Sequence, residues 1–242
     1  MTTSLPDAMT RYQLTERDKL CLIWIAMQYA IRLDQLRRLL FRFTPESDRH
    51  KLKPGTDCLS LDRTYEIIKK WLELGLIEKK IILHGDKLWI WISRQGLREL
   101  EISFNYSGAP ASDRLPHLFF INQVRLGIET KRPNDQWKSE RQIRKEAPRI
   151  VKGEKRPHTP DAILYAQSGK ITAIEVELRT KDDDDLEEKL RELAVSYKSI
   201  WYFATSVTQR KIERMLEGFM PEMQKPFVIY SLKEYGNDYG IS

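Results

Sequence analysis

The apolar residues of the first sixty positions recur at intervals of three or four, which is the spacing of one face of a helix. The first such segment follows Thr15, a residue type suited to cap a helix N-terminus. Its apolar stripe consists of Leu20, Ile23, Trp24 and Met27. A second, shorter helix is predicted from the stripe of Leu33, Leu36, Leu39 and Leu40. A loop with prolines and a glycine follows over 44–60.

A third helix is predicted to begin near Leu61 and to end at Gly75, a residue type that favours helix C-termini. Its spacing predicts a buried face of Leu61, Tyr65, Ile68 and Leu72. The outward face then carries Arg63, Thr64, Lys69 and Lys70. Two strand-like runs, 76–83 and 87–92, are joined by a turn over 84–86 and predict a hairpin.

The segment W-L-E-L-G-L-I-E at 71–78 resembles winged helix-turn-helix proteins, and S-R-Q-G-L-R-E-L at 93–100 resembles the helix that follows their hairpin. The resemblance implies that the third helix enters the major groove of double-stranded DNA and that the hairpin, or wing, touches phosphates. The expected DNA contacts are Arg63, Thr64, Lys69, Lys70, Lys79, Lys80 and Lys87. The alternative is a protein-binding module, because winged helices also serve as dimerisation units.

The second half of the chain mixes helical and strand patterns in the order αβββαβαβ. The expected elements are a buried helix from 115, a strand over 136–141 ending near Glu140, a basic loop over 144–156, strands over 160–166 and 170–178, a helix after the acids at 182–185, a strand over 199–204, a helix over 208–218 and a strand over 226–230. This order suits a central sheet with helices on its faces.

Carboxylates collect on one face of the hairpin formed by the strands over 160–166 and 170–178. Strand alternation puts Glu175 and Glu177 on the same face. A three-residue turn with Gly169 in a left-handed conformation puts Asp161 across from Glu175, whereas a two-residue turn separates them. Like charges so close together repel unless a cation lies between them. We therefore expect Mg²⁺ or Mn²⁺ held by Asp161, Glu175 and Glu177.

The order Pro160-Asp161, thirteen residues, then Glu175-Val176-Glu177 resembles the PD-(D/E)XK signature of restriction-endonuclease-like enzymes. The resemblance implies metal-dependent hydrolysis of DNA. The chain departs from the signature at Glu177, where a lysine is usual. Arg179 and Lys181 are the candidates for a displaced cation.

Four motifs behind the winged helix, P-H-L-F-F-I-N, W-K-S-E-R, H-T-P-D-A and E-V-E-L-R-T-K, resemble the replication-relaxation family, which includes the MobC class of plasmid relaxases. The resemblance implies nicking at a plasmid origin. It also implies a set of catalytic residues, in which Glu140, Asp161, Glu175 and Glu177 lie at the metal site and Lys181 matches the family's trailing lysine. His158 is expected beside this set.

Charge and cysteine content add modest constraints. Forty-one Lys and Arg against thirty-five Asp and Glu give a net charge of +6, a slight bias toward polyanionic partners. Cys21 and Cys58 are far apart and fit neither a disulfide framework nor a zinc site, which favours a cytoplasmic location. Apolar runs fall short of the roughly 20 residues that a membrane span needs, so no membrane partner is expected.

The predicted architecture is α+β, with a winged helix-turn-helix domain over 1–110 and a restriction-endonuclease-like α/β domain with a central mixed sheet over 111–242. The predicted function is sequence-specific DNA binding with metal-dependent endonuclease or nickase activity for a plasmid or other mobile element. A homodimer and other mobile-element proteins are further expected partners. The alternative is a non-catalytic regulator with a degenerate, dimerising nuclease-like domain that has lost its lysine. A separate alternative is that Glu175 and Glu177 merely form the solvated face of an edge strand.

Overall fold

The computed structural model describes residues 13–49, 55–148, 158–179 and 182–235. The chain divides into two compact units, Met1–Leu115 and Pro116–Ser242. The boundary expected from the sequence, between 110 and 111, lies slightly earlier. Each unit has its own sheet, and the larger sheet is mixed.

The elements of unit 1 are α2 (Glu16–Gln28), β1 (Ala30–Arg32), α3 (Leu33–Arg42), α4 (Glu46–Arg49), α5 (Leu61–Glu73), β2 (Ile77–Lys80), β3 (Trp89–Ile92) and α6 (Arg94–Glu99). The three predicted helices are confirmed, and Thr15 caps α2 in a capping box with Asp18. The hairpin strands are shorter than predicted. Strand β1, which was not predicted, pairs with β3, so the sheet order is β1-β3-β2. Three residues are too few for a strand pattern to stand out in the sequence.

Helix α5 is rotated by about one residue relative to the predicted phase. Its buried residues are Thr64, Ile67, Ile68 and Trp71. Leu61 and Tyr65 are instead 47% and 44% exposed, so the prediction that they are buried is wrong, as is the outward orientation of Thr64. Trp71 has the largest apolar surface in this helix, and burying it fixes the phase. Thr64 tolerates burial because its hydroxyl donates a hydrogen bond to the Ser60 carbonyl, at 2.8 Å.

The elements of unit 2 are α7 (Leu115–Lys131), β4 (Gln136–Ser139), α8 (Glu140–Glu146), β5 (Ala162–Tyr165), β6 (Ile171–Glu177), α9 (Asp183–Ser196), β7 (Ile200–Ala204), α10 (Ser206–Glu217), α11 (Pro221–Gln224) and β8 (Phe227–Ser231). The predicted order of helices and strands in unit 2 is confirmed. Helices α8 and α11 were not predicted. The prediction of a loop from 144 is wrong as far as 146, because Ser139 and Gln142 form a capping box that starts α8. Most of the remaining predicted loop, 149–156, lies outside the described residues.

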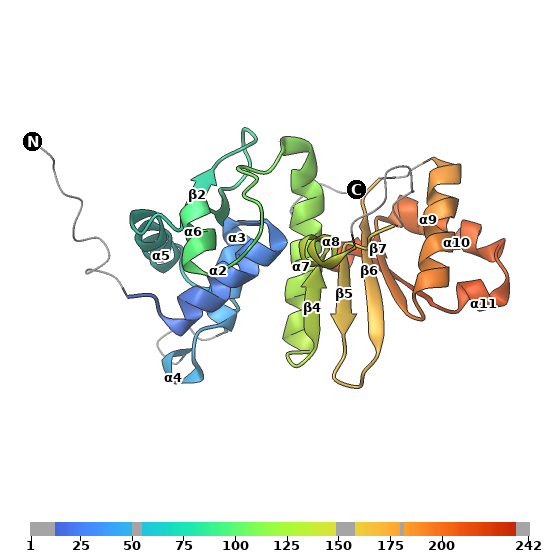
Figure 1. Ribbon diagram of the computed structural model, residues 1–242, viewed down its shortest axis with the longest axis horizontal. Helices are drawn as coiled ribbons and strands as arrows, with labels where there is room; N and C mark the ends of the chain where they lie inside the picture. The colour runs from blue at the N-terminus through green and yellow to red at the C-terminus, as the bar shows by residue number, and fades with distance from the viewer. Residues whose placement is uncertain (1–12, 50–54, 149–157, 180–181, 236–242) are drawn as a thin grey trace, which may run out of the picture. The chain divides into compact units, whose positions relative to one another are not determined.

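The sheet of unit 2 has the strand order β4-β5-β6-β7-β8. Strands β4, β5 and β6 pair antiparallel, and β6, β7 and β8 pair parallel. One face packs against α9 and α10 through a core that includes Leu190, Tyr202 and Ile212. Helix α7 lies on the opposite side of this sheet (Figure 1). The guanidinium of Arg132, directly after α7, lies over the ring of Trp201.

The β5–β6 hairpin has the predicted three-residue turn. Gly169 has a φ of 83°, and its N–H donates to the Ala166 carbonyl at 2.8 Å. Ala162 pairs with Ile174. Continuing this register by one residue places Asp161 across from Glu175. The start of β5 and the carboxyl ends of the parallel strands β6 and β7 therefore lie at the same edge of the sheet. In open sheets this edge is where ligands commonly bind.

Candidate functional site

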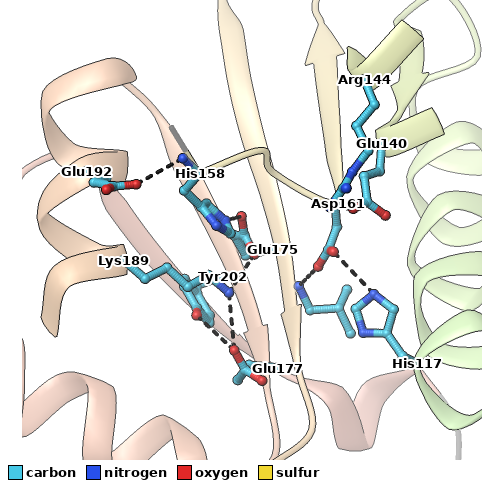
Figure 2. Close-up of polar contacts among 11 residues, drawn as sticks. His117, Glu140, Arg144, His158, Asp161, Glu175, Glu177, Lys189, Glu192 and Tyr202 are labelled. Carbon is cyan, nitrogen blue, oxygen red and sulfur yellow. Dashed lines mark hydrogen bonds and ion pairs between the residues drawn. The ribbon is translucent and has the colours of Figure 1, made fainter. Parts of the chain in front are cut away.

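A cavity of about 400 Å³ lies at this edge of the sheet. Its described lining residues are His117, Glu140, Arg144, His158, Thr159, Asp161, Glu175, Val176, Glu177 and Lys189. Helices α7, α8 and α9 and strand β6 all contribute side chains (Figure 2). The structure thus brings together four of the predicted site residues, Glu140, Asp161, Glu175 and Glu177. The fifth, Lys181, lies outside the described residues.

Asp161 is held on three sides. Its carbonyl accepts the N–H of Glu140 at 2.9 Å, and its Oδ2 accepts the N–H of Val176 at 2.8 Å. Its Oδ1 lies 3.2 Å from Nε2 of His117 on α7. Burial alone would raise the pKa of Asp161. His117, Lys189 and the Val176 N–H together outweigh this effect and lower the pKa from its ordinary value to about 2. The carboxylate is therefore charged at neutral pH.

His117 is the partner of Asp161 that the sequence interpretation missed. Burial lowers its pKa, but the Asp161 carboxylate, with smaller effects from Glu140 and Glu175, raises it above the ordinary 6.5. A histidine whose pKa is raised by folding stabilises the fold fully below its unfolded pKa. That contribution is lost as the pH rises through the folded value.

We predict that an NMR titration of the His117 ring gives a pKa above 6.5 and that Asp161→Asn lowers it, because the substitution removes the main opposing charge. Asp184→Asn, which removes an exposed carboxylate at the start of α9, is the matched control and leaves the His117 pKa unchanged. Equal titration curves for wild type and Asp161→Asn would contradict the ion pair.

Glu175 lies at the centre of the cavity wall and is 1% exposed. Its Oε1 is 2.6 Å from Nε2 of His158, and its Oε2 is 2.8 Å from Nζ of Lys189. His158 is itself held, because its main-chain N–H donates to Oε2 of Glu192 on α9 at 2.9 Å. Both oxygens of this buried carboxylate are thus engaged by side chains.

Lys189 is the cation between the two glutamates of β6. Its Nζ lies 3.1 Å from Oε2 of Glu177 as well as against Glu175, and it stands 5.2 Å from the ring centre of Tyr202. Burial lowers its pKa, but Glu175, Tyr202 and Glu177 outweigh that effect and raise it well above 10.5. Lys189 was missed in the sequence, yet a signal exists. It lies on the buried stripe of α9, between Leu186 and Leu193.

Glu177 was predicted to bind the metal ion, but in the structure its carboxylate contacts two side chains of the protein. Its Oε2 accepts hydrogen bonds from Nζ of Lys189 and, at 3.5 Å, from the hydroxyl of Tyr202. Burial raises the pKa of Tyr202, so this hydroxyl keeps its proton and donates. The sequence predicted a metal ion as the positive charge between Glu175 and Glu177. The ammonium group of Lys189 supplies that positive charge instead. Arg179, the other candidate cation, is exposed.

The carboxylates of the cavity are the groups that a divalent ion would bind. Within the described ranges, no group of three or more His, Cys, Asp or Glu side chains is arranged to hold a metal. Asp161 and Glu175 nevertheless offer hard carboxylate oxygens at one cavity wall. Each of these oxygens accepts a hydrogen bond or faces a cation within the protein, and a carboxylate oxygen has two lone pairs. Toward a hard cation, the two carboxylates therefore offer only the lone pairs that these hydrogen bonds leave.

In unit 1, five of the seven predicted DNA-contacting residues are exposed: Arg63, Lys69, Lys79, Lys80 and Lys87. Thr64 is buried, which corrects its prediction. Lys70 is corrected too, because its Nζ donates to Oδ2 of buried Asp18 at 2.7 Å and to the Gln13 carbonyl at 2.8 Å. It joins α5 to α2 instead of facing outward.

The exposed face of α5 is of mixed charge. Asp62, Glu66 and Glu73 accompany Arg63 and Lys69 on it. Lys69 lies 3.9 Å from Glu73 in an ion pair. Two adjacent lysines on β2, Lys79 and Lys80, are by contrast both exposed on the hairpin. The hairpin is thus the better candidate for contact with a polyanion.

Comparison with models of known protein families finds none that matches this chain, and comparison with curated proteins finds no match either. Among the described residues, none of the helices combines the length and the apolar character needed to cross a membrane. The interpretation of the cavity therefore depends on its own geometry and charge.

Proposed function

We propose that the chain is a metal-dependent DNA endonuclease or nickase, in which unit 1 has a winged-helix fold that binds double-stranded DNA and unit 2 has a restriction-endonuclease-like fold. The observation that carries the proposal is that Asp161, which directly precedes the Ala162–Ile174 pair of the hairpin, and Glu175 line the same cavity, with Nζ of Lys189 at 2.8 Å from Glu175. The PD-(D/E)XK signature, which the sequence resembles, combines two acids with a lysine. Here helix α9 supplies the lysine, and β6 carries Glu177 in its place.

The cavity residues divide the chemical tasks. Asp161 and Glu175 would hold Mg²⁺ or Mn²⁺, and that ion would supply an activated water and neutralise charge on the phosphate. Lys189 sets a fixed positive charge beside Glu175, and Glu177 and Tyr202 hold that ammonium group in place. A role at the origin of a plasmid or other mobile element follows from the resemblance of the four motifs alone.

A nicking assay tests the proposal. Supercoiled plasmid is incubated with wild type and with Asp161→Asn, each with Mg²⁺, with Mn²⁺ or with a chelator. We expect metal-dependent nicking by wild type and a loss of about 100-fold or more in Asp161→Asn, since even changes to groups that support a ligand reduce activity by about 10- to 100-fold. Asp184→Asn controls for charge. Equal nicking by wild type and Asp161→Asn would exclude this site as its source.

A non-catalytic DNA-binding regulator is the second candidate function. It is favoured by the hydrogen bonds that already engage the oxygens of Asp161 and Glu175, and by the absence of a three-ligand group among the described residues. This function predicts DNA binding without cleavage under any of the metal conditions. It also predicts that Asp161→Asn leaves the DNA affinity unchanged.

DNA binding by the hairpin is tested separately. We expect the double variant Lys79→Gln/Lys80→Gln to weaken binding and to reduce the slope of log K against log salt by about two, because each phosphate contact contributes roughly 0.9 to that slope. Lys198→Gln/Lys225→Gln removes the same charge from exposed positions of unit 2 and is the matched control. DNA affinity that is absent or independent of salt would favour a protein-binding module instead.

A further inference from the structure

Helix α8 joins the cavity through its first residue. The N–H of Glu140 donates to the carbonyl of Asp161 at 2.9 Å, and Ser139 begins the helix in a capping box with Gln142. The start of α8 is thus fixed to Asp161. One turn later Arg144 lines the same cavity, and its guanidinium pairs with the Glu140 carboxylate.

The lysine and arginine among the described lining residues differ in their surroundings. The side chain of Lys189 is 8% exposed and is engaged by two glutamates. The side chain of Arg144 is 51% exposed, and its partner Glu140 is 35% exposed. Arg144 and Lys189 come from separate helices, α8 and α9, that flank the acids (Figure 2). A phosphate entering from solvent therefore meets Arg144 before it meets Lys189.

The Glu140–Arg144 pair is of a kind that a phosphate displaces. An exposed ion pair four residues apart on a helix contributes little stability, because solvent screens it. A guanidinium presents its N–H donors in a planar fork that matches two phosphate oxygens, and such bidentate pairs are among the strong hydrogen bonds of proteins. The pair thus keeps Arg144 over the cavity without holding it tightly.

We propose that Arg144 binds a phosphate of the DNA strand that enters the cavity, and that Glu140 holds the guanidinium in place until that phosphate arrives. This inference rests on the proposed function, because it takes DNA as the ligand. It assigns Glu140 a role different from that of a metal ligand. Glu140 competes with DNA for Arg144.

The test measures binding without cleavage. A fluorescein-labelled 16-base-pair duplex and its single strand are titrated by fluorescence anisotropy with a chelator present, at several salt concentrations. We expect Arg144→Gln to weaken binding about tenfold and to reduce the salt slope by about one. Arg144→Lys keeps the positive charge but lacks the planar fork of N–H donors, so its affinity for DNA is expected to fall between those of wild type and Arg144→Gln. Glu140→Gln is expected to tighten binding about threefold, because it releases the guanidinium.

The matched control is Arg191→Gln, which removes one positive charge from another exposed arginine–glutamate pair of unit 2, that with Glu187. Equal affinities for Arg144→Gln and Arg191→Gln, both folded by circular dichroism, would overturn the inference and leave the nicking test of the proposed function intact. Absence of DNA binding by wild type would overturn both. A specific effect of Arg144→Gln supports the inference even if no nicking is seen.

Discussion

Replacing Lys189 with methionine is expected to destabilise unit 2 by about 3–5 kcal/mol, because it leaves buried carboxylates without their counter-ion. Glu175 and Glu177 are 1% and 9% exposed, so solvent screens them poorly. Methionine fills most of the lysine volume, and the effect is therefore one of charge rather than of a cavity. Urea unfolding followed by circular dichroism, with linear extrapolation to water, measures the change.

Two further variants separate charge from packing. Lys211→Met removes a lysine that pairs with Asp183, whose side chain is 77% exposed, and it is expected to change stability by less than about 1 kcal/mol. The triple variant Lys189→Met/Glu175→Gln/Glu177→Gln removes the whole buried charge group and is expected to regain much of the loss. A Lys189→Met variant as stable as Lys211→Met would mean that another group compensates the two glutamates.

The features that were predictable from the sequence depend on local patterns. The alternation along β6 and a three-residue turn ending at Gly169, one of the two turns considered, predicted Asp161 across from Glu175, and the structure has that turn. Both follow from the geometry of one hairpin, which spans less than twenty residues. Helices α7, α9 and α10 of unit 2 followed in the same way from their spacing of apolar residues.

The features that were missed depend on contacts between distant segments or on competition within one helix. His117 reaches Asp161 from 44 positions earlier in the chain, and no local pattern links the two. The phase of α5 was wrong because two overlapping stripes fit its sequence, and the burial of Trp71 decided between them.

Lys189 shows how a site can differ from its sequence signature while retaining its charge balance. Glu177 adds a negative charge where a lysine was expected, and a lysine twelve residues later in the chain returns over the strand to meet it. A lysine on the apolar stripe of a helix is unusual unless a partner is buried with it. Such a position, next to a strand with two acids on one face, is a sequence signal for a buried ion pair.

Helix α6 lies against the start of the hairpin at a distance that only glycine permits. A Cβ atom at Gly96 would lie 2.1 Å from the carbonyl oxygen of Leu76 and 2.9 Å from Cγ2 of Ile92. The Leu76 carbonyl is fixed, because it accepts the N–H of Ser93 at 3.0 Å. Ser93 in turn caps α6 by accepting the N–H of Gly96 at 2.9 Å. Neither side of this contact has room to move without losing a hydrogen bond.

Gly96→Ala is therefore expected to destabilise unit 1 by about 3 kcal/mol, at the upper end of the effect of overpacking. The sign is informative, because helix propensity alone favours alanine over glycine by about 1 kcal/mol. Gly218→Ala, where the new Cβ would lie 3.4 Å from the Met215 carbonyl, is the matched control and is expected to change stability by less than about 1 kcal/mol. Urea unfolding followed by tryptophan fluorescence distinguishes the two. A Gly96→Ala variant that is more stable than wild type would show that α6 does not approach the hairpin this closely.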